Sequence, residues 1–221
     1  MAKSAVIFDL DGTLITFNFN SKGTKKALLA ELRKMGFGTE GLDETSSTQN
    51  ILDRARESPG RGTGSVEYAK ARRRLFDVID EFEVETIRDT TMFPGAREAL
   101  SRLSSNGVVL AVLTNSGRRA TDYVLAKMGL TETFSFVLTR DEVESMKPSP
   151  EGLRKAMTML PTGVEKVYYV GDSPYDIAAA KSAGVKVISV PTGNYTGETL
   201  KGEGADYVVT SIEMVPGILG T

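Results

Sequence analysis

The chain has 221 residues, of which 40% are hydrophobic and 25% charged, and its formal net charge is -2 at pH 7. This composition is typical of a globular protein with a sizeable core, and so small a charge gives no reason to expect nucleic acid as a partner. Because cysteine and histidine are absent, thiol chemistry and Ser-His-Asp triads are excluded, which leaves carboxylates, lysine, tyrosine and oxygen-held hard cations for any catalysis.

The first predicted element is a strand in "AVIFDLD" (residues 5–11), an apolar run that ends in two carboxylates. Asp9 and Asp11 interrupt the only apolar segment near the start, and no stretch approaches the ~20 apolar residues of a membrane helix. We therefore expect a cytoplasmic protein with no secretory signal and no membrane partner. The sequence does not distinguish a monomer from a homodimer.

The chain changes character between residues 17 and 89, where no convincing strand pattern occurs. Residues 25–35 have the spacing of an amphipathic helix, and residues 49–57 and 66–82 have the pattern of further helices. We expect a helical insertion of roughly 70 residues, which is a plausible size for a small domain.

From residue 93 onward, strand-like and helix-like segments alternate. The predicted helices are residues 94–103, 118–128, 150–160 and 174–183, and the predicted strands are residues 108–115, 134–139, 166–172, 185–190 and 206–209. Fully apolar strands that alternate with helices indicate a parallel sheet covered on both faces.

Polar residues follow several of these strands at the points where the strands end. The residues concerned are Asp9, Asp11, Gly12, Thr114, Asn115, Lys147, Asp172 and Asp176. Taken singly, each has an ordinary structural explanation as a turn, a helix cap, a surface lysine or a first-turn acid. Ligands of open parallel sheets bind beyond the carboxyl ends of the strands, however, so all of them should lie at one edge of the sheet.

The segments "DLDGT", "LTN", "KP" and "GDSPYD", in this order, resemble the four motifs of the haloacid dehalogenase superfamily of phosphotransferases. The helical insertion after the first motif resembles the cap of its phosphoglycolate phosphatase-like and sugar-phosphate mutase-like branch. The resemblance implies an α/β fold, with a Rossmann-like three-layer core (residues 1–16 and 90–221) around a parallel sheet. A small all-helical cap (residues 17–89) would be inserted after the first strand.

The resemblance also implies a Mg2+-dependent phosphatase that acts on a small phosphorylated metabolite. Asp9 would be the nucleophile that forms an aspartyl-phosphate, and Asp11 would be the acid and then the base. Mg2+ would be held by Asp9, by the main-chain carbonyl of Asp11 and by Asp172.

The remaining motif residues would bind the phosphate. Lys147 would offset the negative charge and belongs, with Thr114, among the expected catalytic residues. The Thr114 hydroxyl, the Asn115 amide and backbone N-H groups around Gly12 would donate hydrogen bonds to the phosphoryl oxygens. Asp176 would hold Lys147 or a metal-bound water.

Two alternatives remain open. A phosphosugar mutase of the beta-phosphoglucomutase type would use the same core but return the phosphate to its substrate. A non-catalytic receiver-like module would keep the phosphate on the aspartate as a signal, although such receivers are shorter and lack an inserted cap. A dehalogenase is disfavoured, because its chemistry needs neither Asp11 nor Asp172.

The substrate is harder to predict, because the insertion has no recognisable motif. "LITFNFN" lacks the Asp-Ser that many relatives carry just after the first motif, which weakens the inference of phosphoglycolate as the substrate. Arg54, Arg56 and Arg61 are candidates to bind a second anionic group, although exposed helix arginines are more often solvated.

Overall fold

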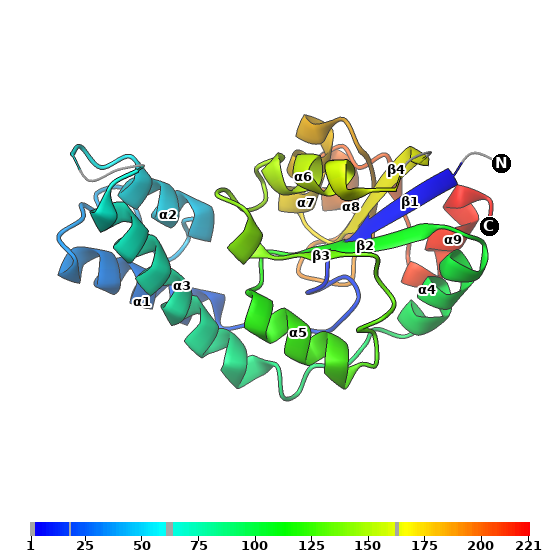
Figure 1. Ribbon diagram of the computed structural model, residues 1–221, viewed down its shortest axis with the longest axis horizontal. Coiled ribbons are helices and arrows are strands. Elements are labelled where there is room, and N and C mark those ends of the chain that lie inside the picture. The colour runs from blue at the N-terminus through cyan, green and yellow to red at the C-terminus, as the bar shows by residue number, and fades with distance from the viewer. Residues whose placement is uncertain (1–2, 18, 61–63, 162–163) are drawn as a thin grey trace. The chain divides into compact units, whose positions relative to one another are not determined.

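The computed structural model describes residues 3–17, 19–60, 64–161 and 164–221. The described residues form two compact units. The larger unit contains the chain up to Phe17 together with Asp89–Thr221, and the smaller unit is the segment between them. The elements of both units are labelled in Figure 1.

The larger unit is built on a parallel sheet with strand order β3-β2-β1-β4-β5-β6. The strands are β1 (Lys3–Phe8), β2 (Val109–Leu113), β3 (Val137–Leu138), β4 (Val164–Gly171), β5 (Lys186–Ser189) and β6 (Tyr207–Val208). β1 and β4 lie at the centre, and after the polar residues near their N-terminal ends both strands are apolar, because helices cover both faces of the sheet.

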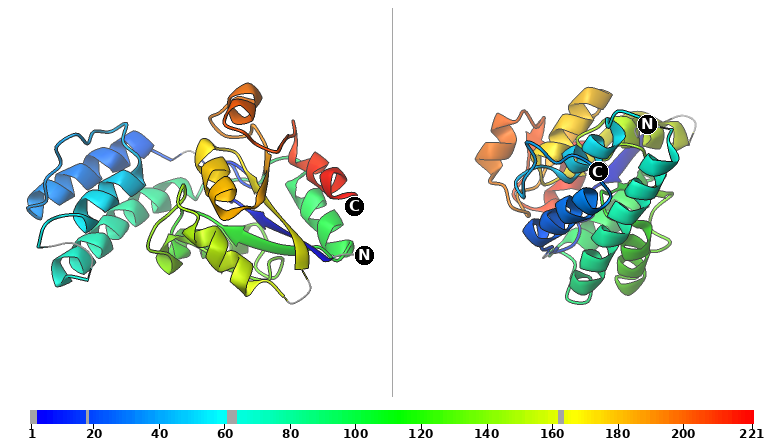
Figure 2. Two further views of the ribbon diagram at one scale, coloured as in Figure 1. Left: turned by 90° about the horizontal axis from the view of Figure 1, so that it is seen from above. Right: turned by 90° about the vertical axis from the view of Figure 1, so that its left-hand side faces the viewer.

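Helices cover the two faces of this sheet in separate layers (Figures 1 and 2). They are α4 (Ala96–Ser105), α5 (Arg118–Lys127), α6 (Glu151–Met159), α7 (Pro174–Ala183), α8 (Gly197–Gly202) and α9 (Val215–Leu219), with short 3-10 turns η1 (Arg140–Glu142) and η2 (Ile212–Met214). α6 and α7 pack together on one face, and α4 packs on the other face with α9. The predicted α/β class with a parallel sheet is therefore confirmed.

The larger unit differs from the prediction at β3 and at its last helices. The strand expected at residues 134–139 is reduced to the two residues of β3, which pair with Val112 and Leu113 of β2 at the sheet edge. The Ser135 N-H also bonds to the Leu110 carbonyl of β2, but without the continuous pairing of a strand. The short helices α8 and α9 were not predicted, because six and five residues are too few to show a periodic pattern.

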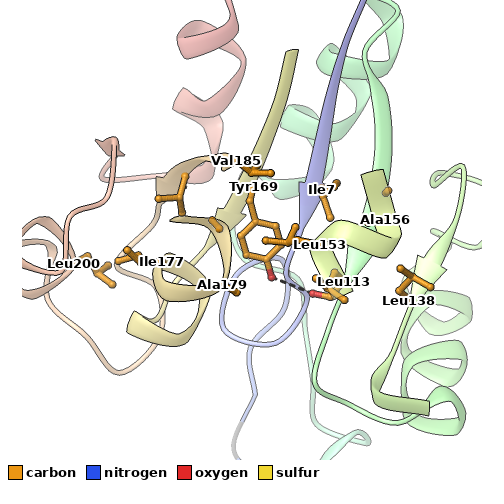
Figure 3. Close-up of a cluster of buried hydrophobic side chains, with 13 residues drawn as sticks. Ile7, Leu113, Leu138, Leu153, Ala156, Tyr169, Ile177, Ala179, Val185 and Leu200 are labelled. Carbon is orange, nitrogen blue, oxygen red and sulfur yellow. Dashed lines mark hydrogen bonds between the residues drawn. The ribbon is translucent and has the colours of Figure 1, made fainter. Parts of the chain in front are cut away.

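A buried cluster fills the space between the sheet and the layer that contains α6 and α7 (Figure 3). Ile7 of β1, Leu113 of β2 and Tyr169 of β4 meet Leu153 of α6 and Ile177 of α7 in this cluster. All five side chains are at most 2% exposed. Their close packing gives the carboxyl edge of the sheet a rigid base.

The smaller unit consists of α1 (Ser21–Lys34), α2 (Thr48–Arg56) and α3 (Val66–Thr86), which lie side by side (Figure 2). The side chain of the residue just before each helix caps it by accepting a backbone N-H bond. α1 begins four residues before the predicted start, because Asn20 provides this cap. The described residues of this unit contain no strand.

The arginines that were singled out in this segment have acidic neighbours. Arg56 forms a 2.8 Å ion pair with Asp53, and the Arg54 guanidinium is 3.7 Å from Glu40. Arg61 lies outside the described residues. Their proposed contact with a second anionic group therefore stays a prediction. Within the described ranges, every helix is too short or too polar to cross a membrane.

Candidate active site

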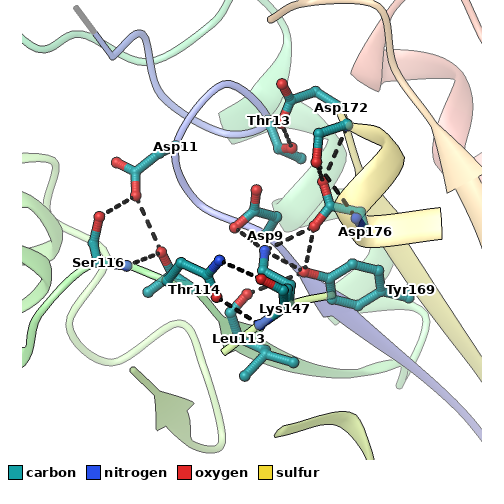
Figure 4. A network of polar contacts seen from close by, with 12 residues as sticks. Asp9, Asp11, Thr13, Leu113, Thr114, Ser116, Lys147, Tyr169, Asp172 and Asp176 are labelled. Carbon is teal, nitrogen blue, oxygen red and sulfur yellow. Dashed lines mark hydrogen bonds and ion pairs between the residues drawn. The ribbon is translucent and has the colours of Figure 1, made fainter. Parts of the chain in front are cut away.

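The carboxyl ends of three neighbouring strands bring the predicted site residues together (Figure 4). Asp9 directly follows β1, Thr114 follows β2, and Asp172 follows β4. The strand order β2-β1-β4 places these three ends next to one another. All three side chains are at most 7% exposed, so the site is a buried polar cluster and not a set of surface charges.

Lys147 lies in the loop before α6, and its ammonium group is at the centre of the cluster. Its Nζ is 2.7 Å from Asp9 Oδ1 and 2.7 Å from Asp176 Oδ1. Burial acts to lower the pKa of Lys147, but the facing carboxylates of Asp176 and Asp9 outweigh it and raise this pKa. Lys147 therefore stays positively charged at physiological pH.

Three carboxylates surround this side of the cluster. One oxygen each of Asp9, Asp172 and Asp176 lies within 4.8 Å of the others. Burial, opposed by Lys147, raises the pKa of Asp9 well above its usual range. Burial, followed by the charge of Asp176, raises the pKa of Asp172 to about 7. So many acids around one ammonium favour a further cation.

The oxygen donors fit a hard divalent ion such as Mg2+. Both oxygens of Asp176 are already hydrogen-bonded: Oδ1 accepts from Lys147 Nζ, and Oδ2 accepts from the Ser173 backbone N-H and hydroxyl at 3.0 and 2.6 Å. Asp9 and Asp172 are therefore the better ligands. The polypeptide also closes tightly around Asp172, because a Cβ on Gly193 would lie 1.8 Å from Asp172 Oδ2.

The side chain of Asp11 has different partners from those of Asp9. Its Oδ2 accepts hydrogen bonds from the hydroxyls of Thr114 (3.0 Å) and Ser116 (2.6 Å). Burial raises the pKa of Asp11, and the bonds from Ser116 and Thr114 oppose the rise. A carboxyl with a raised pKa keeps its proton to a higher pH than an exposed one, as a group that acts first as acid and then as base requires. The expected metal contact through its main-chain carbonyl stays a prediction.

Asn115 and Gly12 have partners in this structure that the sequence did not indicate. The Asn115 side chain donates to the Lys147 carbonyl and accepts from the Lys147 backbone N-H, both at 3.0 Å. It thus holds the main chain of the loop that carries Lys147, and its expected contact with the phosphate stays a prediction, because the amide has a second N-H to donate. Gly12 has a φ of +81° and its carbonyl accepts a bond from the Thr192 hydroxyl.

Sequence reasoning missed three further residues of the cluster. Thr13 donates to Asp172 Oδ1 at 3.0 Å, Ser116 donates to Asp11, and the Tyr169 hydroxyl accepts a 2.8 Å bond from Lys147 Nζ. Thr13 is the last residue of "DLDGT" and Ser116 directly follows "LTN", so their hydroxyls were a usable signal. Tyr169 gave no such signal in the sequence, because it belongs to an apolar strand.

The fold and the site together define a class of protein. It is an α/β protein with a parallel sheet, and the buried carboxylates and lysine at the carboxyl edge of the sheet form a reaction centre that suits a hard cation and an anionic substrate. A family model described as haloacid dehalogenase-like hydrolase matches residues 6–190 of the chain. The chain belongs to the haloacid dehalogenase-like hydrolases. The expectation of a hydrolase of this superfamily is confirmed.

Relatives match the chain over nearly its full length. A phosphoglycolate phosphatase of Pseudomonas fluorescens is 30% identical over 97% of this chain and 79% of its own length. A plasmid-encoded phosphoglycolate phosphatase of Cupriavidus necator is 31% identical, over 98% and 93%. Among solved structures, a protein of Thermotoga maritima assigned as a beta-phosphoglucomutase is 25% identical with a TM-score of 0.62, and 98% of each chain is covered.

Proposed function

We propose that the chain is a Mg2+-dependent phosphatase that hydrolyses a small phosphomonoester through an aspartyl-phosphate on Asp9. The observation that carries this proposal is the 2.7 Å contact between the buried carboxylate of Asp9 and the ammonium of Lys147. The hydrolase family and the phosphoglycolate phosphatases among the relatives support the same reaction class.

In the first step, Asp9 attacks the phosphorus atom and the bond to the leaving alkoxide breaks. Lys147 holds Oδ1 of Asp9, so we assign the attack to its other oxygen. The lysine charge reduces the repulsion between the carboxylate and a dianionic phosphate. The product is an acyl phosphate, which water cleaves more readily than the original ester.

Asp11 moves the protons. Thr114 and Ser116 both donate to Oδ2, which leaves Oδ1 to carry a proton. Because burial raises its pKa, Asp11 can protonate the leaving alkoxide. It then takes a proton from the water that attacks the phosphoryl group, which releases phosphate and restores the Asp9 carboxylate.

Asp9 and Asp172 would hold the metal, together with the main-chain carbonyl of Asp11. A bound Mg2+ supplies positive charge that offsets the charge of the phosphate. Asp176, whose two oxygens are engaged by Lys147 and Ser173, keeps Lys147 in place.

A phosphosugar mutase is the second candidate, and the Thermotoga maritima structure favours it. This reaction would use the same residues of the larger unit. The difference lies in the fate of the phosphate, which a mutase returns to its substrate. Among the described residues, no contact favours a lasting phospho-aspartate signal.

The test is a phosphate-release screen over phosphoglycolate, sugar phosphates and nucleotides, with Mg2+ and with EDTA. We expect release from at least one monoester with Mg2+ and none with EDTA. Full activity in EDTA would contradict the metal site. Turnover of a sugar phosphate without phosphate release, and only after a sugar bisphosphate is added, would favour the mutase.

A further inference from the structure

The side chain of Tyr169 belongs to the hydrophobic core and to the polar cluster at once. Its ring is fully buried against Ile7, Leu113, Leu153 and other core residues (Figure 3). Its hydroxyl lies among the charged residues of the site (Figure 4). The reaction proposed above does not use this group, although it is a buried phenol within hydrogen-bond distance of Lys147.

The Tyr169 hydroxyl completes the set of acceptors around the lysine ammonium. A lysine ammonium can donate three hydrogen bonds and cannot accept any. Lys147 Nζ has three acceptors in this structure, namely Asp9 Oδ1 at 2.7 Å, Asp176 Oδ1 at 2.7 Å and the Tyr169 oxygen at 2.8 Å. Each proton therefore has one acceptor, and the ammonium has a single well-defined orientation.

The contact is a hydrogen bond and not a cation-π interaction. Lys147 Nζ is 2.8 Å from the Tyr169 oxygen but 5.5 Å from the ring centroid, so it lies beyond the hydroxyl end of the ring. The hydroxyl hydrogen has two acceptors within reach, the Leu113 carbonyl and Asp176 Oδ1, each at 3.1 Å. Burial, followed by the charge of Asp176, raises the pKa of Tyr169, so the phenol keeps this hydrogen.

The position of this oxygen is set by the sheet. Tyr169 is on β4, paired with Ile7 of β1, and its hydroxyl reaches past β1 to the carbonyl of Leu113 at the end of β2. Lys147, in contrast, lies in a loop between η1 and α6. Its ammonium thus depends on its partners for its position, and Tyr169 is the partner that belongs to a packed strand.

We propose that Tyr169 is a positioning residue of the hydrolase site, whose hydroxyl orients the Lys147 ammonium and, through it, the Asp9 carboxylate. The expected effect on kinetics rests on the proposed function. The expected effect on the position of Lys147 does not. Loss of the hydroxyl leaves a buried ammonium proton unpaired, so the ammonium turns and Asp9 loses its preferred orientation.

The test compares Tyr169→Phe with Tyr168→Phe. The two substitutions remove the same atom from adjacent residues of one strand, whose side chains point to opposite faces of the sheet. With p-nitrophenyl phosphate and saturating Mg2+, we expect kcat of Tyr169→Phe to fall about tenfold with little change in KM. Tyr168→Phe should match the wild type in both. A lower active fraction would also reduce the apparent kcat at an unchanged KM, so the ammonium exchange rate, which does not depend on the active fraction, separates a positioning role from a purely structural one.

A second measurement does not depend on activity. In protein labelled with 15N-lysine, the wild type should show one slowly exchanging ammonium with a nuclear Overhauser contact to the Tyr169 ring. Exchange should be about tenfold faster in Tyr169→Phe and unchanged in Tyr168→Phe. If Tyr169→Phe does not fold, absence of the ammonium contact in the wild type would by itself overturn the proposal.

The outcomes separate the two proposals. If the wild type is active and the two variants have the same kcat and the same ammonium exchange, the positioning role of Tyr169 is wrong and the proposed function stands. If the wild type hydrolyses no phosphate ester, the proposed function is wrong, and the ammonium measurement alone decides whether Tyr169 orients Lys147.

Discussion

The Thr13 hydroxyl donates a 3.0 Å hydrogen bond to Asp172 Oδ1, across 159 positions of the chain. The bond joins the turn after β1 to the end of β4, and both side chains are buried. It acts to lower the pKa of Asp172, against the larger effect of burial, which raises it. Thr13 thus favours the ionised carboxylate that a metal requires.

Thr13→Val should weaken Mg2+ binding at neutral pH by about tenfold, because the pKa of Asp172 rises further when the hydrogen bond is lost. Titration calorimetry of the purified variant measures the change. Thr13→Ser keeps the hydroxyl and should restore most of the affinity. Equal Mg2+ affinity in the Val and Ser variants would show that this hydrogen bond does not tune the carboxylate.

Asp9→Asn should abolish hydrolysis of an aryl phosphate, with a loss of at least about a thousandfold in kcat, because the amide is not a nucleophile. The substitution is nearly isosteric, so the circular dichroism spectrum should not change. Asp122→Asn, on the exposed surface of α5, is the matched control and should keep full activity. Retained hydrolysis by Asp9→Asn would remove Asp9 from the mechanism.

The metal-free protein should lose stability as the pH rises from about 4 to about 7. Burial, with Asp176 as the next cause, raises the pKa of Asp172 from 3.8 to about 7, and the pKa values of Asp9 and Asp11 are raised too. In this window the folded state binds more protons than the unfolded state, so the free energy of unfolding falls with rising pH.

Urea unfolding in EDTA at about pH 5 and about pH 7.5 measures this effect, and we expect a decrease of about 2 kcal/mol. Mg2+ should reverse the decrease at the higher pH, because it binds the ionised carboxylates of the folded state. Asp172→Asn should show a weaker pH dependence. A free energy that rises over this window would contradict the raised pKa values.

Most of the fold could be predicted because local signals and long-range packing agree. The run from Val109 to Leu113 is wholly apolar, and the structure buries all of it as β2. The bounds of α7 were predicted to the residue, because Pro174 and Asp176 mark its start and Gly184 marks its end. At β3 the local pattern and the long-range packing disagree. The local pattern predicted a longer strand, but the number of residues that pair also depends on the neighbouring strand β2.

Part of the site was predictable because its residues directly follow strands, whereas Lys147 and Asp176 were indicated by the motif resemblance. Asp9 and Asp172 meet because each ends a neighbouring strand. The partner of Asn115 depends on the path of the loop that carries Lys147, which no local pattern encodes. Tyr169 has the same difficulty, since its ring fits the apolar pattern and only the strand order reveals what its hydroxyl contacts.

Gly193 should not tolerate a side chain without a loss of metal binding, although it lies outside the four motifs. A Cβ at this position would lie 1.8 Å from Asp172 Oδ2, so alanine must displace either the Asp172 carboxylate or the loop after β5. We expect Gly193→Ala to weaken Mg2+ binding by about tenfold or more, seen as a smaller Mg2+-induced rise in melting temperature.

Gly217 offers the control for this substitution, because a Cβ there would meet no atom within 4 Å and its place in α9 suits alanine. Gly217→Ala should therefore bind Mg2+ like the wild type and be at least as stable. If Gly193→Ala also keeps the wild-type response to Mg2+, then the carboxylate of Asp172 can move without loss of the metal, and its assignment as a ligand would be wrong.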